Sequence, residues 1–373
     1  MVFRLFVILC MLFVIPLTSC NDKKDIVNEQ DSRVVLVYIG ANNNLVSDAY
    51  NSLNAMEEGM VGLDADVYVY AALAGTTPKI YKIVADQSPE IKSTVVKSYG
   101  DQDSANPEVM KQILQTMKEY VGNRPSGLVL WSHATNWLPN VGVKLMSFNE
   151  DRGNKTELRD LQTIIPSGLD FLMFDACSMA SVEVLYQLRD KAKYTIASPA
   201  EVLSTSMPYE LVLQHLVDPN LERGLKSTAS TYFNFYNQLT GPYQSATISV
   251  VNNAYWSELA NNVHIALTKS PLTTIYRDNL QRLDFDDKSL SAGFDFLDFV
   301  NQNMLSSDGE AIRSTVSKLV VYKANTRNFL GKPILKFSGL SCYVPNDLNK
   351  WIHPYYNGLQ WAKDSGFNSF VRE

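Results

Sequence analysis

The sequence contains few cysteines, no cluster of basic residues and no long apolar run after residue 17. Only four cysteines occur in 373 residues and none forms a Cys-x-x-Cys pair, so we expect no metal site. The formal net charge of −6 and the lack of Lys/Arg clusters argue against nucleic acid as a partner. No later stretch reaches the length of about 18 apolar residues that a membrane-spanning helix needs.

The composition is that of a large globular protein, with 46% hydrophobic and 19% charged residues and no internal repeat. A chain of this length can bury roughly three quarters of its unfolded surface. It is therefore long enough for one large α/β domain or for two ordinary ones.

The N-terminus carries a targeting pattern. Arg4 precedes an apolar run over residues 5–17, which is too short to cross a bilayer of about 30 Å. The run ends in "LTSC", which resembles the lipobox of bacterial lipoproteins. We expect residues 1–19 to be a lipoprotein signal peptide, Cys20 to be lipidated, and the polar residues 20–32 to form a tether. The chain would then be an exported lipoprotein of the bacterial cell envelope, on the periplasmic or surface face of the outer membrane; an ordinary signal peptide is the alternative.

If Cys10 is removed and Cys20 is lipidated, two cysteines are left, Cys177 and Cys342. In an exported protein these two can form a disulfide, although they lie far apart in the sequence. The pairing stays open at this point.

Apolar, β-branched segments alternate with helical patterns in the first two thirds of the chain. Their near-continuous apolar character is typical of strands buried on both faces of a mostly parallel sheet. The sequence therefore predicts an α/β fold. We predict strands at 33–40, 65–73, 127–133, 169–177 and 193–199, helices at 48–60, 107–121, 157–164 and 179–190, and a short antiparallel excursion at 79–85 and 93–99.

The last third of the chain is less regular. Helices are expected at 207–217, 223–240 and 254–268, and strands at 245–251 and 339–345, whereas 271–333 is polar and irregularly helical. No Pro/Gly/Ser linker marks a boundary. We predict a core over residues 33–270 with an α+β C-terminal extension, residues 271–373, packed on it.

Two predicted strands end in residues with reactive side chains. His133 ends one strand, and Cys177 ends another directly before a helical pattern. Ligands of open α/β sheets bind at the carboxyl ends of strands, and a thiol at a helix N-terminus has a lowered pKa. Cys177 could thus be a nucleophile served by His133. The alternative is structural, a hydrogen-bonded imidazole and a small buried thiol.

These two segments, "LVLWSHATNW" (128–137) and "DACSMASVEVLYQLRD" (175–190), resemble the signature blocks of the clostripain-like cysteine peptidases, relatives of caspases and gingipains. Further similar blocks are "VYIGANNNL" (37–45), "IASPAEVLSTSMPYE" (196–210), "FSGLSCYVP" (337–345) and "YYNGLQWAKDSGF" (355–367). The resemblance implies a caspase-like, mostly parallel sheet sandwiched between helices. It also implies hydrolysis of protein or peptide substrates through a Cys/His dyad and an acyl-enzyme.

By position, the resemblance makes Cys177 the nucleophile and His133 the general acid/base. The backbone N–H groups of Ala134 and Cys177 would form the oxyanion hole. Asp175 matches an acid near the pocket for a basic substrate side chain, although a buried structural carboxylate that caps the following helix is an equal alternative. We expect Trp137 to form a pocket wall and Trp131 to lie in the core.

The chain departs from the family pattern on both sides of Thr135. The family has glycine at the positions of Ala134 and Asn136. Asn tolerates a left-handed backbone, but Ala does not. If the turn needs a positive φ at Ala134, the oxyanion donor is misdirected. A catalytically inactive binding lipoprotein with the peptidase fold is therefore the alternative function.

The family's second acid for a basic substrate side chain is also missing. This chain has Ser204, Thr205 and Ser206 in that loop, and Glu201 is the nearest carboxylate. Cleavage after basic residues is one expectation, and a smaller or polar substrate side chain is the other.

We expect the reaction to need no cofactor. The acidic run "DFDD" (284–287) could bind calcium, but it lacks the ligand spacing of an EF-hand loop. A solvated acidic turn is the preferred interpretation.

Overall fold

The structure is a computed structural model that describes residues 32–139, 148–285 and 293–371. Its centre is a nine-stranded sheet in the order β12-β10-β9-β8-β5-β1-β2-β3-β4. The five central strands pair in parallel, as predicted. They are β1 (Val34–Ala41), β2 (Asp66–Leu73), β5 (Ser126–Trp131), β8 (Leu169–Asp175) and β9 (Ala192–Ala197).

The outer strands on both sides of the sheet run antiparallel to their neighbours. The predicted excursion forms β3 (Lys79–Lys82) and β4 (Thr94–Ser98) beside β2. On the other side, β10 (Thr247–Asn252) pairs with β9, and β12 (Val320–Asn325) pairs with β10. Since β12 comes from the C-terminal extension, the extension contributes a strand to the sheet in addition to packing on the core.

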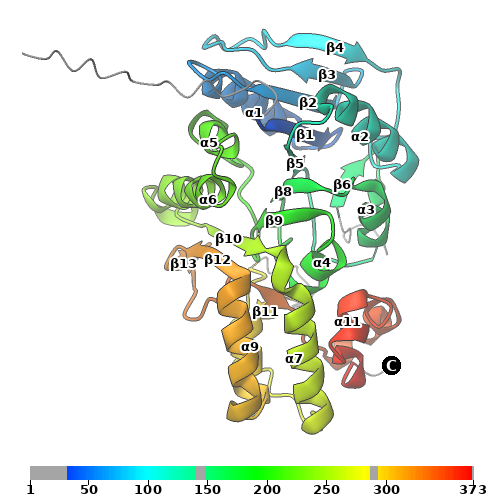
Figure 1. The fold of residues 1–373 in the computed structure, drawn as a ribbon, viewed down its shortest axis with the longest axis vertical. Coiled ribbons are helices and arrows are strands. Elements are labelled where there is room, and N and C mark those ends of the chain that lie inside the picture. The colour runs from blue at the N-terminus through cyan, green and yellow to red at the C-terminus, as the bar shows by residue number, and fades with distance from the viewer. Residues whose placement is uncertain (1–31, 140–147, 286–292, 372–373) are drawn as a thin grey trace, which may run out of the picture.

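Helices cover both faces of the sheet, which explains why the central strands carry apolar side chains on both faces. In β1, Val35 and Val37 pack with one hydrophobic cluster, and Leu36 and Tyr38 pack with the other. The first face carries α1 (Val46–Gly59), α5 (Tyr209–Leu216) and α6 (Leu221–Asn237); the second carries α2 (Pro107–Val121), α3 (Leu158–Ile164), α4 (Val182–Gln187) and α7 (Trp256–Lys269) (Figure 1). The predicted fold class is confirmed.

Local signals set the bounds of the best-predicted helix. The Asn106 side chain accepts hydrogen bonds from the N–H groups of Glu108 and Val109, and Pro107 occupies the first helical position. Gly122, with φ of 62°, ends the helix. As a result, α2 spans the predicted residues 107–121.

The remaining elements are short or lie in the extension. The hairpin of β6 (Phe148–Asp151) and β7 (Asn154–Thr156) lies next to β1. The predicted strand at 339–345 is reduced to β15 (Ser341–Cys342), which pairs with β11 (Phe294–Asp295). The others are η2 (Gly241–Tyr243), η3 (Asn253–Tyr255), α8 (Phe296–Asn303), α9 (Ser306–Leu319), β13 (Asn328–Phe329), β14 (Lys332–Pro333), η4 (Asp347–Ile352), α10 (His353–Tyr356), α11 (Gln360–Asp364) and η5 (Phe367–Ser369).

Cys177 and Cys342 are both free thiols, so the open disulfide pairing is not formed. No helix among the described residues is long and apolar enough to cross a membrane. The expected signal peptide, Cys20 and nearly all of the tether lie outside the described residues.

Glu183 joins the C-terminal extension to α4. Its side chain is fully buried, and its Oε1 accepts hydrogen bonds from the Tyr343 N–H (2.9 Å) and the Tyr356 hydroxyl (3.2 Å). Burial raises the pKa of Glu183 from 4.5 to about 7. The folded protein therefore binds this proton more tightly than the unfolded chain does.

We predict that Glu183→Gln stabilises the protein at alkaline pH. In the native chain, Glu183 costs stability as the pH rises from 4.5 to about 7, because only the folded form still holds the proton there. Each pKa unit corresponds to about 1.4 kcal/mol, so the upper bound of the gain is about 3 kcal/mol. Urea unfolding at about pH 4 and about pH 8 measures it, and an equal effect at both values would contradict the prediction.

Candidate active site

The pairing of β5 with β8 brings His133 and Cys177 together. Trp131 at the end of β5 is the register partner of Asp175 at the end of β8, and the strands run in parallel. His133 and Cys177 each follow two residues later, so they leave the sheet side by side. Both line one cavity of about 150 Å³, with Leu45, Trp131, Ser132, Asp175, Ala176, Val202, Leu203, Ser204 and Ser206.

The Cys177 thiol is a neutral, hydrogen-bonded group in this structure. Its Sγ accepts the Val202 N–H at 3.3 Å and donates to the Val202 carbonyl oxygen at 3.6 Å. Burial raises the pKa of the Cys177 thiol to about 11. The expected lowering of this pKa by a helix N-terminus is wrong, because α4 begins only at Val182 and the effect of the helix dipole falls off within one turn.

The His133 imidazole is also neutral. Burial lowers the pKa of His133, and the nearby carboxylates of Glu150 and Asp48 act against this effect. The Nε2 atom lies 2.8 Å from the Oδ1 atom of Asn44, in the turn after β1. Cys177 and His133 are therefore both uncharged, and they do not form a thiolate–imidazolium ion pair.

The main chain of Ala134, whose N–H is one of the predicted oxyanion donors, lies beside β6. Ala134 forms an antiparallel bridge with Phe148, in which the Asn149 N–H donates to the His133 carbonyl oxygen at 3.0 Å. In this type of pair, the bridging residue directs its own N–H away from the partner strand. The Ala134 N–H therefore points away from β6.

Ala134 does not have a positive φ, so the condition for a misdirected oxyanion donor is not met. Left-handed residues in and next to the site include Asn136 (φ 65°), Ser178 (φ 61°) and Ser206 (φ 65°). The Asn136 Oδ1 accepts from the Trp137 N–H at 2.8 Å and from the Ser181 hydroxyl at 2.5 Å. Asparagine thus replaces the family glycine at a position that needs a positive φ, and its side chain ties the histidine loop to the N-cap of α4.

Asp175 lies at the cavity wall and is almost fully buried. Its Oδ2 accepts hydrogen bonds from the Ser206 hydroxyl, the Tyr209 hydroxyl (2.8 Å) and the Met207 N–H (3.3 Å). Burial raises the pKa of this carboxyl, and the three donors partly offset the effect. The helix-capping alternative for Asp175 does not hold, because Ser181 caps α4.

Two predicted pocket residues lie elsewhere. Trp137 is fully buried among the rings of Tyr343 and Tyr356, with ring centroids 5.3 and 5.0 Å away, so it is a core residue. Trp131 lines the cavity in its place, and its Nε1–H donates to the Ser206 hydroxyl at 2.7 Å. Glu201 does not line the cavity; its Oε1 accepts the Phe285 N–H at 2.7 Å.

Several residues of the site were not predicted from the sequence. Asn44 is part of the Asn-rich turn that the resemblance had singled out, but no pattern assigned it to His133. The apolar cavity wall comes from Leu45, Val202 and Leu203. Tyr209 looked like an ordinary apolar helix residue, although its hydroxyl binds Asp175.

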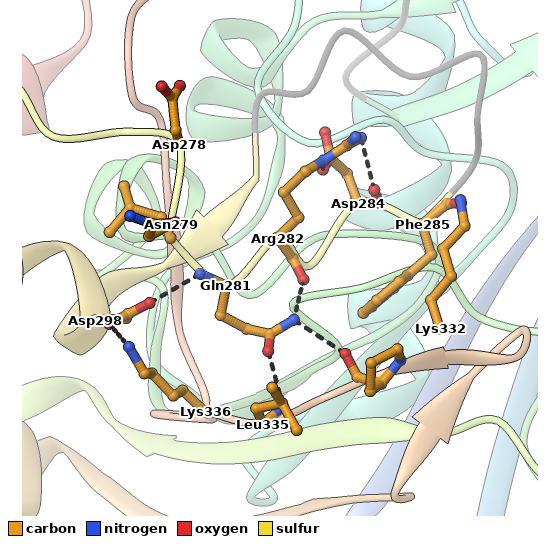
Figure 2. Close-up of a pocket in the computed structure, with 12 residues that line it drawn as sticks. Asp278, Asn279, Gln281, Arg282, Asp284, Phe285, Asp298, Lys332, Leu335 and Lys336 are labelled. Carbon is orange, nitrogen blue, oxygen red and sulfur yellow. Dashed lines mark hydrogen bonds and ion pairs between the residues drawn. The ribbon is translucent and has the colours of Figure 1, made fainter.

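A second cavity, of about 340 Å³, lies in the C-terminal extension (Figure 2). Its charged groups bind one another, Arg282 with Asp284 (3.0 Å) and Lys336 with Asp298 (2.7 Å). Asp284 therefore has a cationic partner, and residues 286 and 287 of the acidic run lie outside the described residues. Among the residues that the structure describes, no cluster of three or more His, Cys, Asp or Glu side chains could hold a metal ion.

A mostly parallel sheet covered by helices, with a cysteine and a histidine at neighbouring strand ends, defines the class of cysteine proteases with a caspase-like fold. The family model described as the clostripain family matches residues 37–371. The chain therefore belongs to the clostripain family.

Solved structures agree with this assignment. An inactive zymogen C11 protease from Parabacteroides distasonis is 28% identical, with 89% of this chain and 97% of that chain covered and a TM-score of 0.78. A secreted C11 cysteine protease from Bacteroides thetaiotaomicron, in complex with an irreversible peptide inhibitor, is 27% identical. The match covers 90% of this chain and 99% of that chain, with a TM-score of 0.78. No curated protein matches the sequence.

We predict that Ala134→Gly leaves the reactivity of Cys177 within about threefold of wild type, because Ala134 does not need a positive φ. The substitution should instead destabilise the fold by about 0.5–1 kcal/mol through backbone entropy. The rate of Cys177 alkylation by iodoacetamide and the urea unfolding midpoint measure the two effects. A large gain in reactivity would show that alanine distorts the turn.

Proposed function

We propose that the protein is a cysteine endopeptidase in which Cys177 is the nucleophile and His133 is the general acid/base. The observation that carries the proposal is the pairing of β5 with β8, from which both side chains enter one cavity. Membership of the clostripain family supports the reaction class.

The reaction follows from the chemistry of the two neutral groups. His133 removes the thiol proton as Sγ attacks the carbonyl carbon of the scissile bond. The Ala134 and Cys177 N–H groups stabilise the oxyanion, and a donor of this kind contributes about 10²–10³ in rate. His133 then protonates the leaving amine. Water, deprotonated by His133, hydrolyses the thioester and restores the thiol. None of these steps needs a cofactor.

A comparison of the two thiols tests this proposal. A peptidyl acyloxymethyl ketone should label Cys177 and leave the buried Cys342 unmodified. Cys177→Ala should abolish labelling, and His133→Ala should slow it by about 10²-fold or more, because the base is lost. Mass spectrometry of labelled peptides and cleavage of a fluorogenic peptide library measure this. Equal, slow labelling of both thiols without cleavage would instead support a catalytically inactive binding protein.

We also propose that the cavity receives an arginine or lysine side chain of the substrate. The three donors to Asp175 all bind Oδ2, which leaves Oδ1 for a cation. Leu45, Trp131 and Leu203 provide apolar walls for the methylene groups of such a side chain. A buried carboxylate with a raised pKa gains most from a cationic partner, because the partner restores its charged form.

Asp175→Asn tests this preference with little change in shape. The amide oxygen can still accept the three donors at Oδ2, while the amide nitrogen replaces Oδ1 and disfavours a cation. We expect kcat/KM for an Arg or Lys substrate to fall by about 30-fold or more, the cost of losing one partner of a buried charge pair. Cleavage of a matched substrate with citrulline at that position should change little. An equal loss for both substrates would indicate a structural role only.

The proposed substrates are proteins or peptides that reach the bacterial cell envelope. The relative from B. thetaiotaomicron is described as secreted, which supports export. We further propose that Cys20 carries the lipid that tethers the domain to the membrane, on the basis of the sequence "LTSC" at residues 17–20.

A further inference from the structure

Asn44 contacts the imidazole of His133 at its Nε2 atom, and His133 lines the same cavity as Cys177. Its Oδ1 lies 2.8 Å from His133 Nε2, and Asn44 belongs to the turn between β1 and α1. We propose that Asn44 is a positioning residue that fixes the tautomer and orientation of His133. This inference rests on the proposed function, because it assigns a role within the Cys177/His133 dyad.

The turn that carries Asn44 is held by its two neighbours. The Asn42 amide donates to Asp151 Oδ1 at 2.7 Å, and the Asn43 amide donates to the Glu150 carbonyl oxygen at 2.8 Å. The Asn43 Oδ1 also accepts the Leu45 N–H at 2.9 Å, which closes the turn on itself. The three successive asparagines thus make different contacts: Asn42 and Asn43 bind β6, and Asn44 binds His133.

The β6–β7 hairpin, which contains Glu150 and Asp151, also holds the main chain of His133. Asp151 in β6 is fully buried and also accepts the Ser104 N–H at 2.6 Å. In the same strand, the Asn149 N–H donates to the carbonyl oxygen of His133 at 3.0 Å. Since β6 holds both the asparagine turn and the histidine backbone, the distance between Asn44 and His133 is fixed by one rigid element.

The contact selects one form of the imidazole. An amide oxygen only accepts hydrogen bonds, so Nε2 must carry the proton and Nδ1 must keep its lone pair. Nδ1 is then the atom that removes the proton from Cys177. In the other tautomer, Nδ1 would carry a proton and could not act as the base.

A neutral amide also keeps the histidine uncharged. A carboxylate at this position would attract a second proton to the ring and raise the pKa of His133, as the Glu150 and Asp48 carboxylates already do from β6 and α1. The thiol of Cys177, which lines the same cavity, is neutral and does not stabilise an imidazolium. Asparagine thus orients the ring without the pKa increase that aspartate would bring.

Asn44→Ala and Asn44→Asp test the inference, with Asn261→Ala at an exposed position of α7 as the matched control. Asn44→Ala should lower kcat by about 10- to 100-fold with little change in KM, because only the orientation of the base is lost. Asn44→Asp should recover part of kcat and move the acidic limb of the pH profile of kcat/KM to higher pH. Asn261→Ala should match wild type.

A spectroscopic measurement makes the inference independent of peptidase activity. The ¹⁵N chemical shifts of His133 should report the Nε2–H tautomer in wild type and a mixture of tautomers in Asn44→Ala. If wild type cleaves no peptide but the tautomer still differs between wild type and Asn44→Ala, the proposed function fails and the positioning role stands. A wild-type kcat together with an unchanged tautomer in Asn44→Ala would overturn the inference.

Discussion

The site depends on the parallel pairing of β5 with β8. Trp131 opposite Asp175 sets the register, and a shift by one residue would turn every side chain of either strand to the opposite face of the sheet. In this register His133 and Cys177 follow the carboxyl ends of neighbouring strands, each two residues after a paired position. The two strands are buried on both faces by separate hydrophobic clusters, so the register that serves the core also assembles the site.

Burial gives the site uncharged reactive groups. Burial raises the pKa of Cys177 to about 11 and lowers that of His133, so the resting form is a thiol beside a neutral imidazole. Val202 occupies both hydrogen-bonding positions of the thiol. Proton transfer from this thiol, as proposed above, would first have to break the hydrogen bond that it donates to the Val202 carbonyl oxygen.

The sequence predicted the central sheet well, because strands buried on both faces carry apolar side chains on both faces. It predicted α2 well, because that helix has clear capping signals. It failed where an interaction involves distant segments. The strand β12 was missed because its burial is only partial along its length. Trp131 is buried in the core as predicted but also lines the cavity, whereas Trp137 lies in the core and not at a pocket wall, since two tryptophans six residues apart carry no sign of which one faces a cavity. The positions of Cys177 and His133 followed from strand ends, but the pKa of Cys177 did not, because burial is a property of the whole fold.

The departures from the family pattern differ in their structural consequences. At Asn136 the backbone needs a positive φ, which asparagine adopts more readily than most residues, and its amide gains bonds that glycine cannot make. Ala134 has no such requirement, so glycine is dispensable there. The missing second acid is different, because Ser206 both donates to Asp175 and accepts from Trp131. A hydroxyl keeps the pocket wall connected but adds no charge, so any attraction for a basic side chain falls on Asp175 alone.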